Sequence, residues 1–544
     1  MAQVTVVADV PNGFPSWVER DIIITNGHDP LGLETIASVR ILPLLLPGVL
    51  ALSRRARYFT FHQFVLDEFV RRKVGSTTRE LDHFMRRAEY EYGYAVKLCS
   101  RCGWDARGVL GDIALRQHRW DAGLAVTRQL SIQTRMGGYG LFYRSPLIFF
   151  GLVLGEGTEL PSGKKVPFDC LAGPRARDLA QLFRDRVAPT AWYKRYLGRD
   201  DAIPKNALAE LAEAACLCRL VDAPTERAAI FDVLFSDDQP VEEAVDEAQQ
   251  RRRSFALNLE AIDKDETSVD DVAAWRHQLW TFADGVARSP EGSTAYRGTA
   301  AQWGALIARE YQQAGLSIIW NVVCEVGNRN QPPYGFTTSE LDALLAVELA
   351  KATGRFKMPK AASTMPVKEY EGHIAGEFAE STLEQILRAG VDAPSGPAGL
   401  ALLLELRRRL PNRDAMPDQW RHIGGIDGSH QEGLIHFLAE FQRRLDSKPT
   451  VLELLMWLAQ HFVISRHQHI AASKLPRFTF RFRRELGRLR FYPDRAHRAF
   501  GAGDPRWEPL MLLSEDLGLW RGTDTGGTLT PDGHAMVNDL THAV

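Results

Sequence analysis

The sequence predicts a mainly α, multi-domain protein with only short strands. Apolar residues recur at three- and four-residue steps through most of residues 173–466, which is the period of amphipathic helices. Strand-like alternation is confined to a few short stretches. The 544 residues are enough for about three or four domains on the usual length prior. We place boundaries that give four consecutive segments, at residues 1–165, 166–466, 467–503 and 504–544.

The first segment is expected to be mostly helical after an irregular start. Val4–Ala8 and Ile22–Thr25 are candidates for short strands. The apolar stretch 39–52 is shorter than the ~20 residues of a membrane span and is broken by prolines, so we interpret it as buried. Thr77 and Glu80 form a capping box that predicts the start of a helix ending near residue 99.

A cluster of arginines precedes the helix expected in the second half of residues 47–73. Arg54, Arg55 and Arg57 lie near its start, where the helix dipole disfavours cations. This mismatch makes them candidates for a nucleic-acid-binding patch. The alternative is that they pair with acidic side chains elsewhere in the chain.

A glycine-rich stretch, Gly137-Gly138-Tyr139-Gly140, lies between Arg135 and Arg144. It has neither the GxGxxG spacing of a dinucleotide site nor the GKS or GKT ending of a P-loop. A turn beside aromatic packing is the simpler interpretation. A glycine loop between two arginines could also approach a phosphate, so both arginines are candidate nucleic-acid contacts.

The central segment, 166–466, is expected to be an irregular helical bundle. Its helices are separated by Pro- and Gly-containing loops, and no fixed repeat period is visible. Thr225, Ser268, Ser339 and Ser381 stand at expected N-caps.

The third segment holds the strongest charge cluster in the chain. Between residues 474 and 498 there are nine basic and two acidic residues, a balance of nine minus two or +7 in a chain of net charge -2. Aromatic residues interleave with the arginines, a composition that favours a phosphate backbone and exposed bases. The candidate contacts are Arg477, Arg481, Arg483, Arg484, Arg488 and Arg490. Strand-like alternation, with Phe478, Phe480 and Phe482 on one face, is the alternative, and it would make these aromatics core.

The tail, 504–544, predicts a helix, two short strands around a Gly-rich turn, and a last helix that begins near Pro531. This order resembles the end of winged-helix domains. In such domains the helix before the strands reads the bases, but here that helix carries Glu515 and Asp516 and is otherwise apolar. Docking to a protein is therefore an equal expectation for this segment.

Six sparse cysteines favour a reducing, cytoplasmic setting. Cys99 and Cys102 form a lone CxxC, and Cys216 and Cys218 lie in an apolar run that is typical of core. No second ligand pair follows closely, so we expect no metal and no cofactor. No signal peptide and no membrane segment are visible.

Two stretches carry a resemblance to known sequences. LPGVLALSRRARYFTFHQFVLDEF, together with GGYGLFYRSPLIFFGL, resembles a poorly characterised bacterial family found in gene clusters for defence against phage. HFVISRHQHIAASKLPRFTFRFRRELGRLRF resembles a segment of similar large bacterial proteins. The resemblance implies a cytoplasmic component of a multi-protein antiviral complex, and it supplies no catalytic residues.

These observations favour a non-enzymatic, DNA-binding or assembly component of such a complex. DNA would be held by its backbone without sequence preference, beside other subunits of the complex. One alternative is a metal-dependent nuclease, for which Asp342, Glu348 and Lys351 are the nearest approach to a site. The other is a protein scaffold in which the basic stretch is buried between subunits.

Overall fold

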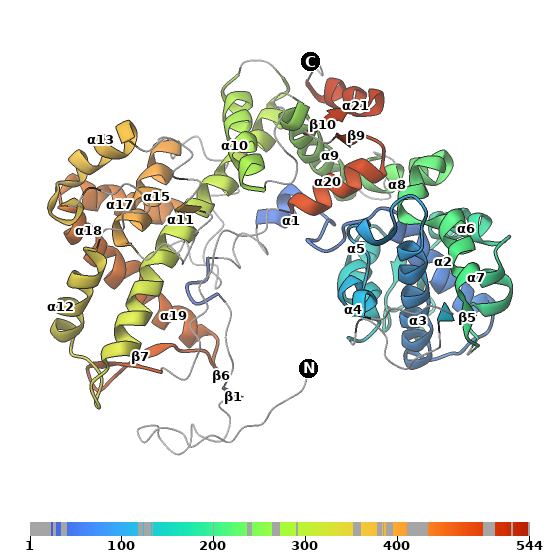
Figure 1. The fold of residues 1–544 in the computed structure, drawn as a ribbon, viewed down its shortest axis with the longest axis horizontal. Coiled ribbons are helices and arrows are strands. Elements are labelled where there is room, and N and C mark those ends of the chain that lie inside the picture. Colours follow the sequence, from blue (N-terminus) through green and yellow to red (C-terminus); the bar gives the residue numbers. More distant parts are fainter. Residues whose placement is uncertain are drawn as a thin grey trace. The chain divides into compact units, whose positions relative to one another are not determined.

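A computed structural model of the chain describes most of its residues (Figure 1). The described residues are 23–24, 29–33, 41–117, 123–124, 132, 134–199, 201–236, 242–263, 272–289, 292–351, 359, 361–377, 383, 386–387, 395–410, 433–492, 506–523 and 526–541. They are mainly helical with only short strands, as the sequence predicts.

The chain divides into two compact units, and each is built from discontinuous segments. The first unit comprises Met1–Leu42, Arg276–Arg288 and Ala300–Asp504. The second comprises Pro43–Trp275, Ser289–Thr299 and Pro505–Val544. This division differs from four consecutive segments, because the tail belongs to the same unit as the first helices.

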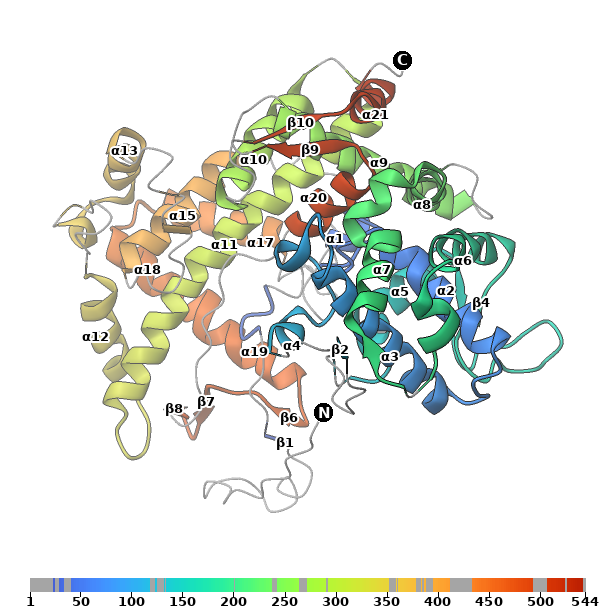
Figure 2. The ribbon, with the colours of Figure 1, turned by 45° about the vertical axis from the view of Figure 1, so that its right-hand side comes forward.

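The second unit is organised around α2 (Arg57–Arg71). Twelve of its fifteen residues are buried, so this helix is covered on nearly every side. It contacts α3 (Thr78–Lys97), α6 (Pro174–Val187) and α8 (Pro224–Phe235), which surround it in both ribbon views (Figure 2). Stacked and edge-to-face aromatic rings fill the space between α2, α3 and α6, as in the Phe61–Tyr92 pair with ring centroids 4.4 Å apart.

Six further helices, with four helical turns and three strand pairs, belong to the described part of the second unit. They are α4 (Asp112–Gln117), α5 (Arg144–Phe149), α7 (Lys205–Ala215), α9 (Glu242–Asp263), α20 (Trp507–Asp516) and α21 (Pro531–Thr541), with helical turns η2 (Gly103–Asp105), η3 (Tyr139–Tyr143), η4 (Trp192–Tyr196) and η5 (Leu217–Asp222). Strand pairs are β2 (Gly123–Leu124) with β5 (Ile203–Pro204), β3 (Val153–Leu154) with β4 (Cys170–Leu171), and β9 (Trp520–Thr523) with β10 (Gly526–Leu529). All three pairs are antiparallel.

The first unit is organised along α11 (Thr294–Asn330), most of which lies in it. The other helices are α12 (Thr338–Leu349), η7 (Ala362–Thr364), α13 (Val367–Glu377), α15 (Gly396–Arg409), α17 (Leu434–Asp446), α18 (Val451–Leu458), η11 (Ala459–Ser465) and α19 (Arg466–Ser473). Two helices, α10 (Val272–Arg288) and α11, pass from one unit into the other, and α1 (Leu42–Leu45) stands at the same boundary. Strand β1 (Ile23–Ile24) pairs in parallel with β6 (Arg477–Phe478), and β7 (Phe482–Glu485) pairs antiparallel with β8 (Arg488–Phe491).

Two glycines let α11 and α15 approach each other closely in the first unit. A Cβ atom on Gly315 would lie 2.8 Å from the carbonyl oxygen of Gly399, and one on Gly399 would lie 2.9 Å from the carbonyl oxygen of Gly315. Real Cβ atoms do not come this close to a backbone oxygen. The crossing therefore depends on the absence of a side chain at both positions.

The local sequence signals had mixed outcomes. The capping box of Thr77 and Glu80 is confirmed, and the tail has the expected helix–strand–strand–helix order. Thr225 and Ser339 as N-caps are wrong, because α8 begins at Pro224 and Thr337 caps α12. Strand Ile22–Thr25 is found as β1, whereas Val4–Ala8, Ser268 and Ser381 lie outside the described residues.

We expect Gly315→Ala to destabilise the first unit by about 1–3 kcal/mol, because the new methyl group forces α11 and α15 apart. Gly372→Ala is the matched control, since Gly372 lies on α13 of the same unit and a Cβ there meets nothing within 4 Å. That change should be neutral or stabilising by about 0.5–1 kcal/mol. Urea unfolding followed by circular dichroism measures both; equal effects would contradict the close crossing.

Candidate functional site

Residues 482–491 of the predicted basic stretch form a β-hairpin in the first unit, while Arg495 and Arg498 lie outside the described residues. Strands β7 and β8 pair in register, with Arg483 opposite Arg490 and Glu485 opposite Arg488. The connecting residues Leu486 and Gly487 both have positive φ, 47° and 77°, as a type I′ turn requires. Leu486 at the tip is fully exposed.

Most of the predicted arginines lie on the surface of this hairpin. Residues that face each other across an antiparallel pair share a face, so Arg483, Glu485, Arg488 and Arg490 lie on one side of the hairpin. Residues 477–492 carry six arginines and one glutamate, a balance of six minus one or +5. Like charges directly opposite each other destabilise a hairpin. The buried Phe482–Phe491 pair is in the same register, and the Arg483 guanidinium lies 5.4 Å from the centroid of the Phe480 ring.

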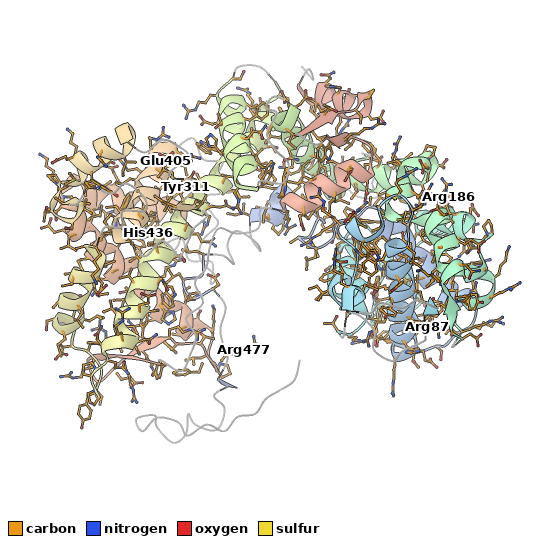
Figure 3. The ribbon with its side chains drawn as sticks, viewed as in Figure 1. Arg87, Arg186, Tyr311, Glu405, His436 and Arg477 are labelled. Atoms are coloured by element: carbon orange, nitrogen blue, oxygen red, sulfur yellow. The ribbon has the colours of Figure 1, made fainter. Side chains whose placement is uncertain are left out.

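Local carboxylates neutralise little of this charge. Arg488 lies 3.5 Å from Glu340, and Arg490 lies 3.8 Å from Glu485. Arg477 and Arg484 are exposed, and neither makes an ion pair with any residue that the structure describes. Figure 3 shows Arg477 at the edge of the first unit. We refer to Arg477, Arg483, Arg484, Arg488 and Arg490 as the hairpin arginines.

The aromatic residues of this stretch are core. Phe478, Phe480, Phe482 and Phe491 are all at most 4% exposed, so they present no face on which a base could stack. The interpretation of these phenylalanines as core is confirmed, but the strand-like alternation is not, because residues 479–481 lie outside the strands and Thr479 and Arg481 are buried as well.

Arg481 does not belong to the exposed set, which corrects its inclusion among the candidate contacts. It is 5% exposed, and burial lowers the pKa of its guanidinium. Its backbone N–H donates to Nε2 of His467 at 2.9 Å, and the other ring nitrogen of His467 lies 3.0 Å from the carbonyl oxygen of Pro30. Burial lowers the pKa of His467 to about 3, so this imidazole is a neutral structural link.

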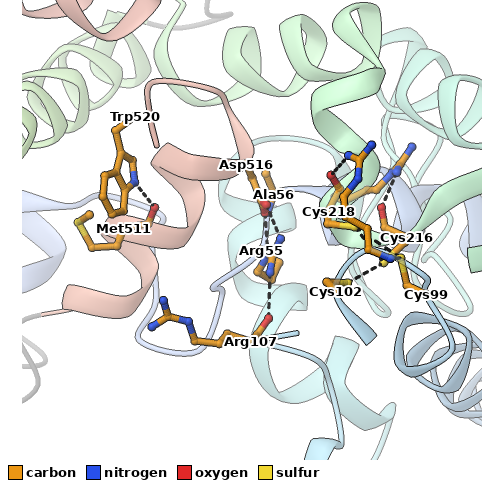
Figure 4. A network of polar contacts seen from close by, with 12 residues as sticks. Arg55, Ala56, Cys99, Cys102, Arg107, Cys216, Cys218, Met511, Asp516 and Trp520 are labelled. Atoms are coloured by element: carbon orange, nitrogen blue, oxygen red, sulfur yellow. Dashed lines mark hydrogen bonds and ion pairs between the residues drawn. The ribbon is translucent and has the colours of Figure 1, made fainter. Parts of the chain in front are cut away.

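Two of the three arginines at the start of α2, Arg55 and Arg57, are also buried. Arg55 makes a bidentate ion pair with Asp516, with contacts of 2.5 and 2.9 Å, and donates to the carbonyl oxygen of Arg107 (Figure 4). Arg57 pairs with Glu226 at 2.7 Å and is fully buried. Both guanidinium groups are removed from the predicted surface patch, and the alternative of acidic partners is correct for them. Arg54 is partly exposed and pairs with Glu508.

The glycine-rich stretch, residues 137–140, is not arranged to receive a phosphate. The N–H groups of Gly138 and Tyr139 donate to the buried carboxylate of Glu89. Arg144 makes a bidentate pair with Asp169, at 2.6 and 3.0 Å, and this pairing, despite burial, lowers the pKa of Asp169. Arg135 is exposed and pairs with Glu156. Residues 137–140 form the start of a helix, so the predicted turn is wrong, whereas the predicted aromatic packing is found in the buried rings of Tyr139 and Tyr143.

The tail helix that precedes the strand pair is largely buried. In the winged-helix comparison that helix is α20, and eight of its ten residues are buried. The Trp520 side chain of β9 donates to the carbonyl oxygen of Met511, which ties the strand pair to α20.

Four cysteines that the sequence places far apart meet in the second unit (Figure 4). Cys99 and Cys102 follow α3, while Cys216 and Cys218 follow α7. The Sγ–Sγ distances are 3.6 Å for Cys99–Cys218, 3.4 Å for Cys102–Cys216 and 3.6 Å for Cys216–Cys218. All four sulfur atoms lie within 4.8 Å of one another. Cys99 and Cys102 are therefore not a lone pair, because Cys216 and Cys218 lie against them.

The thiols perturb one another strongly. Hydrogen bonds from Cys216 and Cys218 lower the pKa of Cys102 to about 4. The hydrogen bond to Cys102, one to Cys218 and burial raise the pKa of Cys216. The signal that could have revealed the cluster was the pair of short spacings, CxxC and CxC, in a chain with only two further cysteines.

Other candidate groups do not converge. Asp342 hydrogen-bonds to Gln460, while Glu348 pairs with Lys351 at 2.7 Å on the surface of α12. Among the residues that the structure describes, the four cysteines are the one group of three or more potential metal ligands. Every helix in the described part of the chain is too short or too polar to span a lipid bilayer.

Comparison with known proteins gives no relative: no family model, curated protein or solved structure matches this chain.

We expect Asp516→Asn to destabilise the second unit by about 3–5 kcal/mol, because it leaves the buried guanidinium of Arg55 without its counter-charge. The matched control is Glu508→Gln, which removes the partner of the neighbouring, partly exposed Arg54. Exposed pairs contribute about 0–1 kcal/mol, so the control should change little. Chemical denaturation of both variants tests this, and a loss of similar size in each would show that burial of the Arg55 pair is unimportant.

Proposed function

We propose that this protein is a non-enzymatic component that binds the DNA backbone through the hairpin arginines. The observation that carries the proposal is the juxtaposition of Arg483 and Arg490 directly across the β7–β8 hairpin. A phosphate placed between or beside these groups would convert a repulsive arrangement into a favourable one. Arg477 on β6 and Arg484, which stands opposite Leu489 on the other side of the hairpin, are exposed and add to the positive charge of this part of the unit.

The expected mode of binding follows from what the hairpin exposes. Among the hairpin arginines, Arg477 and Arg484 are exposed and the other three are half-buried, while the phenylalanines are core, so the surface offers charge and no stacking platform. Contacts of this kind fix position on a nucleic acid without reading its sequence. We therefore propose recognition that depends on salt concentration and is insensitive to base sequence.

The proposed setting is a bacterial anti-phage complex in the cytoplasm, with other protein subunits beside this one. Its support is the sequence resemblance of the stretches beginning at residues 46 and 461. A winged-helix relationship of residues 504–544 rests likewise on the order of helices and strands, and burial of α20 favours a structural role for this segment. No described group of carboxylates favours the nuclease alternative.

The double variant Arg477→Gln/Arg484→Gln tests the proposal. We expect weaker DNA binding and a plot of log K against log salt concentration that is shallower by about 1.8, if each arginine neutralises one duplex phosphate. The control is Arg79→Gln/Arg195→Gln, which removes two exposed arginines of the second unit and the same net charge. Fluorescence anisotropy with labelled single- and double-stranded DNA, with and without magnesium, gives these slopes.

Equal slopes for the two double variants would show that Arg477 and Arg484 do not contact DNA. Absence of binding by the wild-type chain at low salt would favour a protein-facing role for the same arginines. Cleavage of the DNA in magnesium would instead revive the nuclease alternative.

A further inference from the structure

The cysteine cluster of the second unit has the composition and geometry of a closed metal site. Four thiols from two segments, Cys99–Cys102 and Cys216–Cys218, meet at one point, although 114 residues separate Cys102 from Cys216. A chance meeting of four of the six cysteines in a chain of this length is improbable on composition alone. The cluster is separate from the hairpin arginines, which lie in the first unit.

The sulfur–sulfur distances fit a single tetrahedral ion. A Zn–S bond of about 2.3 Å places neighbouring sulfur atoms of a tetrahedron about 3.8 Å apart. The contacts of 3.4–3.6 Å, and the 4.8 Å limit on all pairs, bracket that value. The thiols are free, and their separations are far longer than the ~2.05 Å of a disulfide bond.

The surroundings are suited to the charge of such a centre. Four thiolates around a divalent cation leave a net charge of −2, which needs nearby cations and N–H donors. The backbone N–H of Arg101 points to Sγ of Cys99 at 3.5 Å. The guanidinium of Arg101 donates to the carbonyl oxygen of Cys218, and that of Arg57 donates to the carbonyl oxygen of Cys216.

Two further contacts hold the ligand segments against each other. Ser100, within the CxxC, donates to Glu213 on α7 at 2.5 Å. Arg219, the residue after the CxC, pairs with the same carboxylate. Glu213 therefore ties both ligand segments together and supports the orientation of the sulfur atoms.

We propose that Cys99, Cys102, Cys216 and Cys218 bind one structural zinc ion. All four coordination positions are filled by protein sulfur, so the ion has no open position for a substrate and serves the fold. An iron–sulfur cluster is a poorer fit, because its four cysteines are divided among two or four iron atoms and the sulfur ligands as a set stand further apart than around a single ion. Zinc holds the end of α3 against the end of α7 and closes the intervening loop.

Metal analysis of the full-length protein, purified without a metal-chelating tag, tests the proposal directly. We expect about one zinc ion per chain by mass spectrometry of the metal, and its release when a mercurial reagent titrates the thiols. Substitution with Co²⁺ should give the intense visible absorption and the sulfur-to-metal charge-transfer band of a tetrahedral tetrathiolate. One iron ion per chain in place of zinc would overturn the assignment of the metal.

Variants locate the site. Cys102→Ser/Cys218→Ser should lose the zinc and lower the melting temperature, whereas Cys170→Ser, at a cysteine outside the cluster, should retain about one zinc ion per chain. If the double variant fails to fold, the metal content and mercurial titration of the wild-type chain still decide the matter. A wild-type chain that folds without stoichiometric metal, or that holds these cysteines as disulfides, would overturn the proposal.

Discussion

Two buried guanidinium groups at the start of α2 constrain the whole second unit. Arg55 binds Asp516 and the carbonyl oxygen of Arg107, while Arg57 binds Glu226 and the carbonyl oxygen of Cys216. A buried charge is costly unless its hydrogen-bonding groups are satisfied, so these partners must all be in place at once. The position of α2 is thereby linked to α8, to α20 and to the segment that carries the cysteines.

The contacts of Arg57 connect a buried ion pair to the proposed zinc site. Arg57 lies between Glu226 and the backbone of Cys216, so the geometry of one ion pair influences the orientation of a proposed ligand. Thr60 donates to Glu226 at 2.6 Å and fixes the carboxylate from the next turn of α2. Packing of aromatic rings around α2 excludes water from this region, which strengthens every electrostatic interaction within it.

What the sequence could predict here was local. Helical periodicity and the capping box at Thr77 each depend on neighbours a few residues away, and both are found in the structure. The alternation around Phe480 identified the buried phenylalanines but not the burial of Thr479 and Arg481. The burial of Arg55 and the meeting of the cysteines depend on partners 461 and 114 residues away. No local pattern specifies such long-range contacts, and the charge of Arg55 favoured an exposed position that it does not occupy.

The long sequence separation of Arg55 from Asp516 also determines when their ion pair can form during synthesis. Ribosomes add roughly 5–20 residues per second, so the 461 residues between the two partners take about 20–90 s to make. Through that interval the guanidinium of Arg55 is still hydrated and the apolar surface that α20 will cover is still open. Glu226, the partner of Arg57, and the four cysteines of the cluster have, in contrast, all been synthesised once residue 226 is added. A zinc ion bound at that stage would hold α3 and α7 together until the tail has been synthesised.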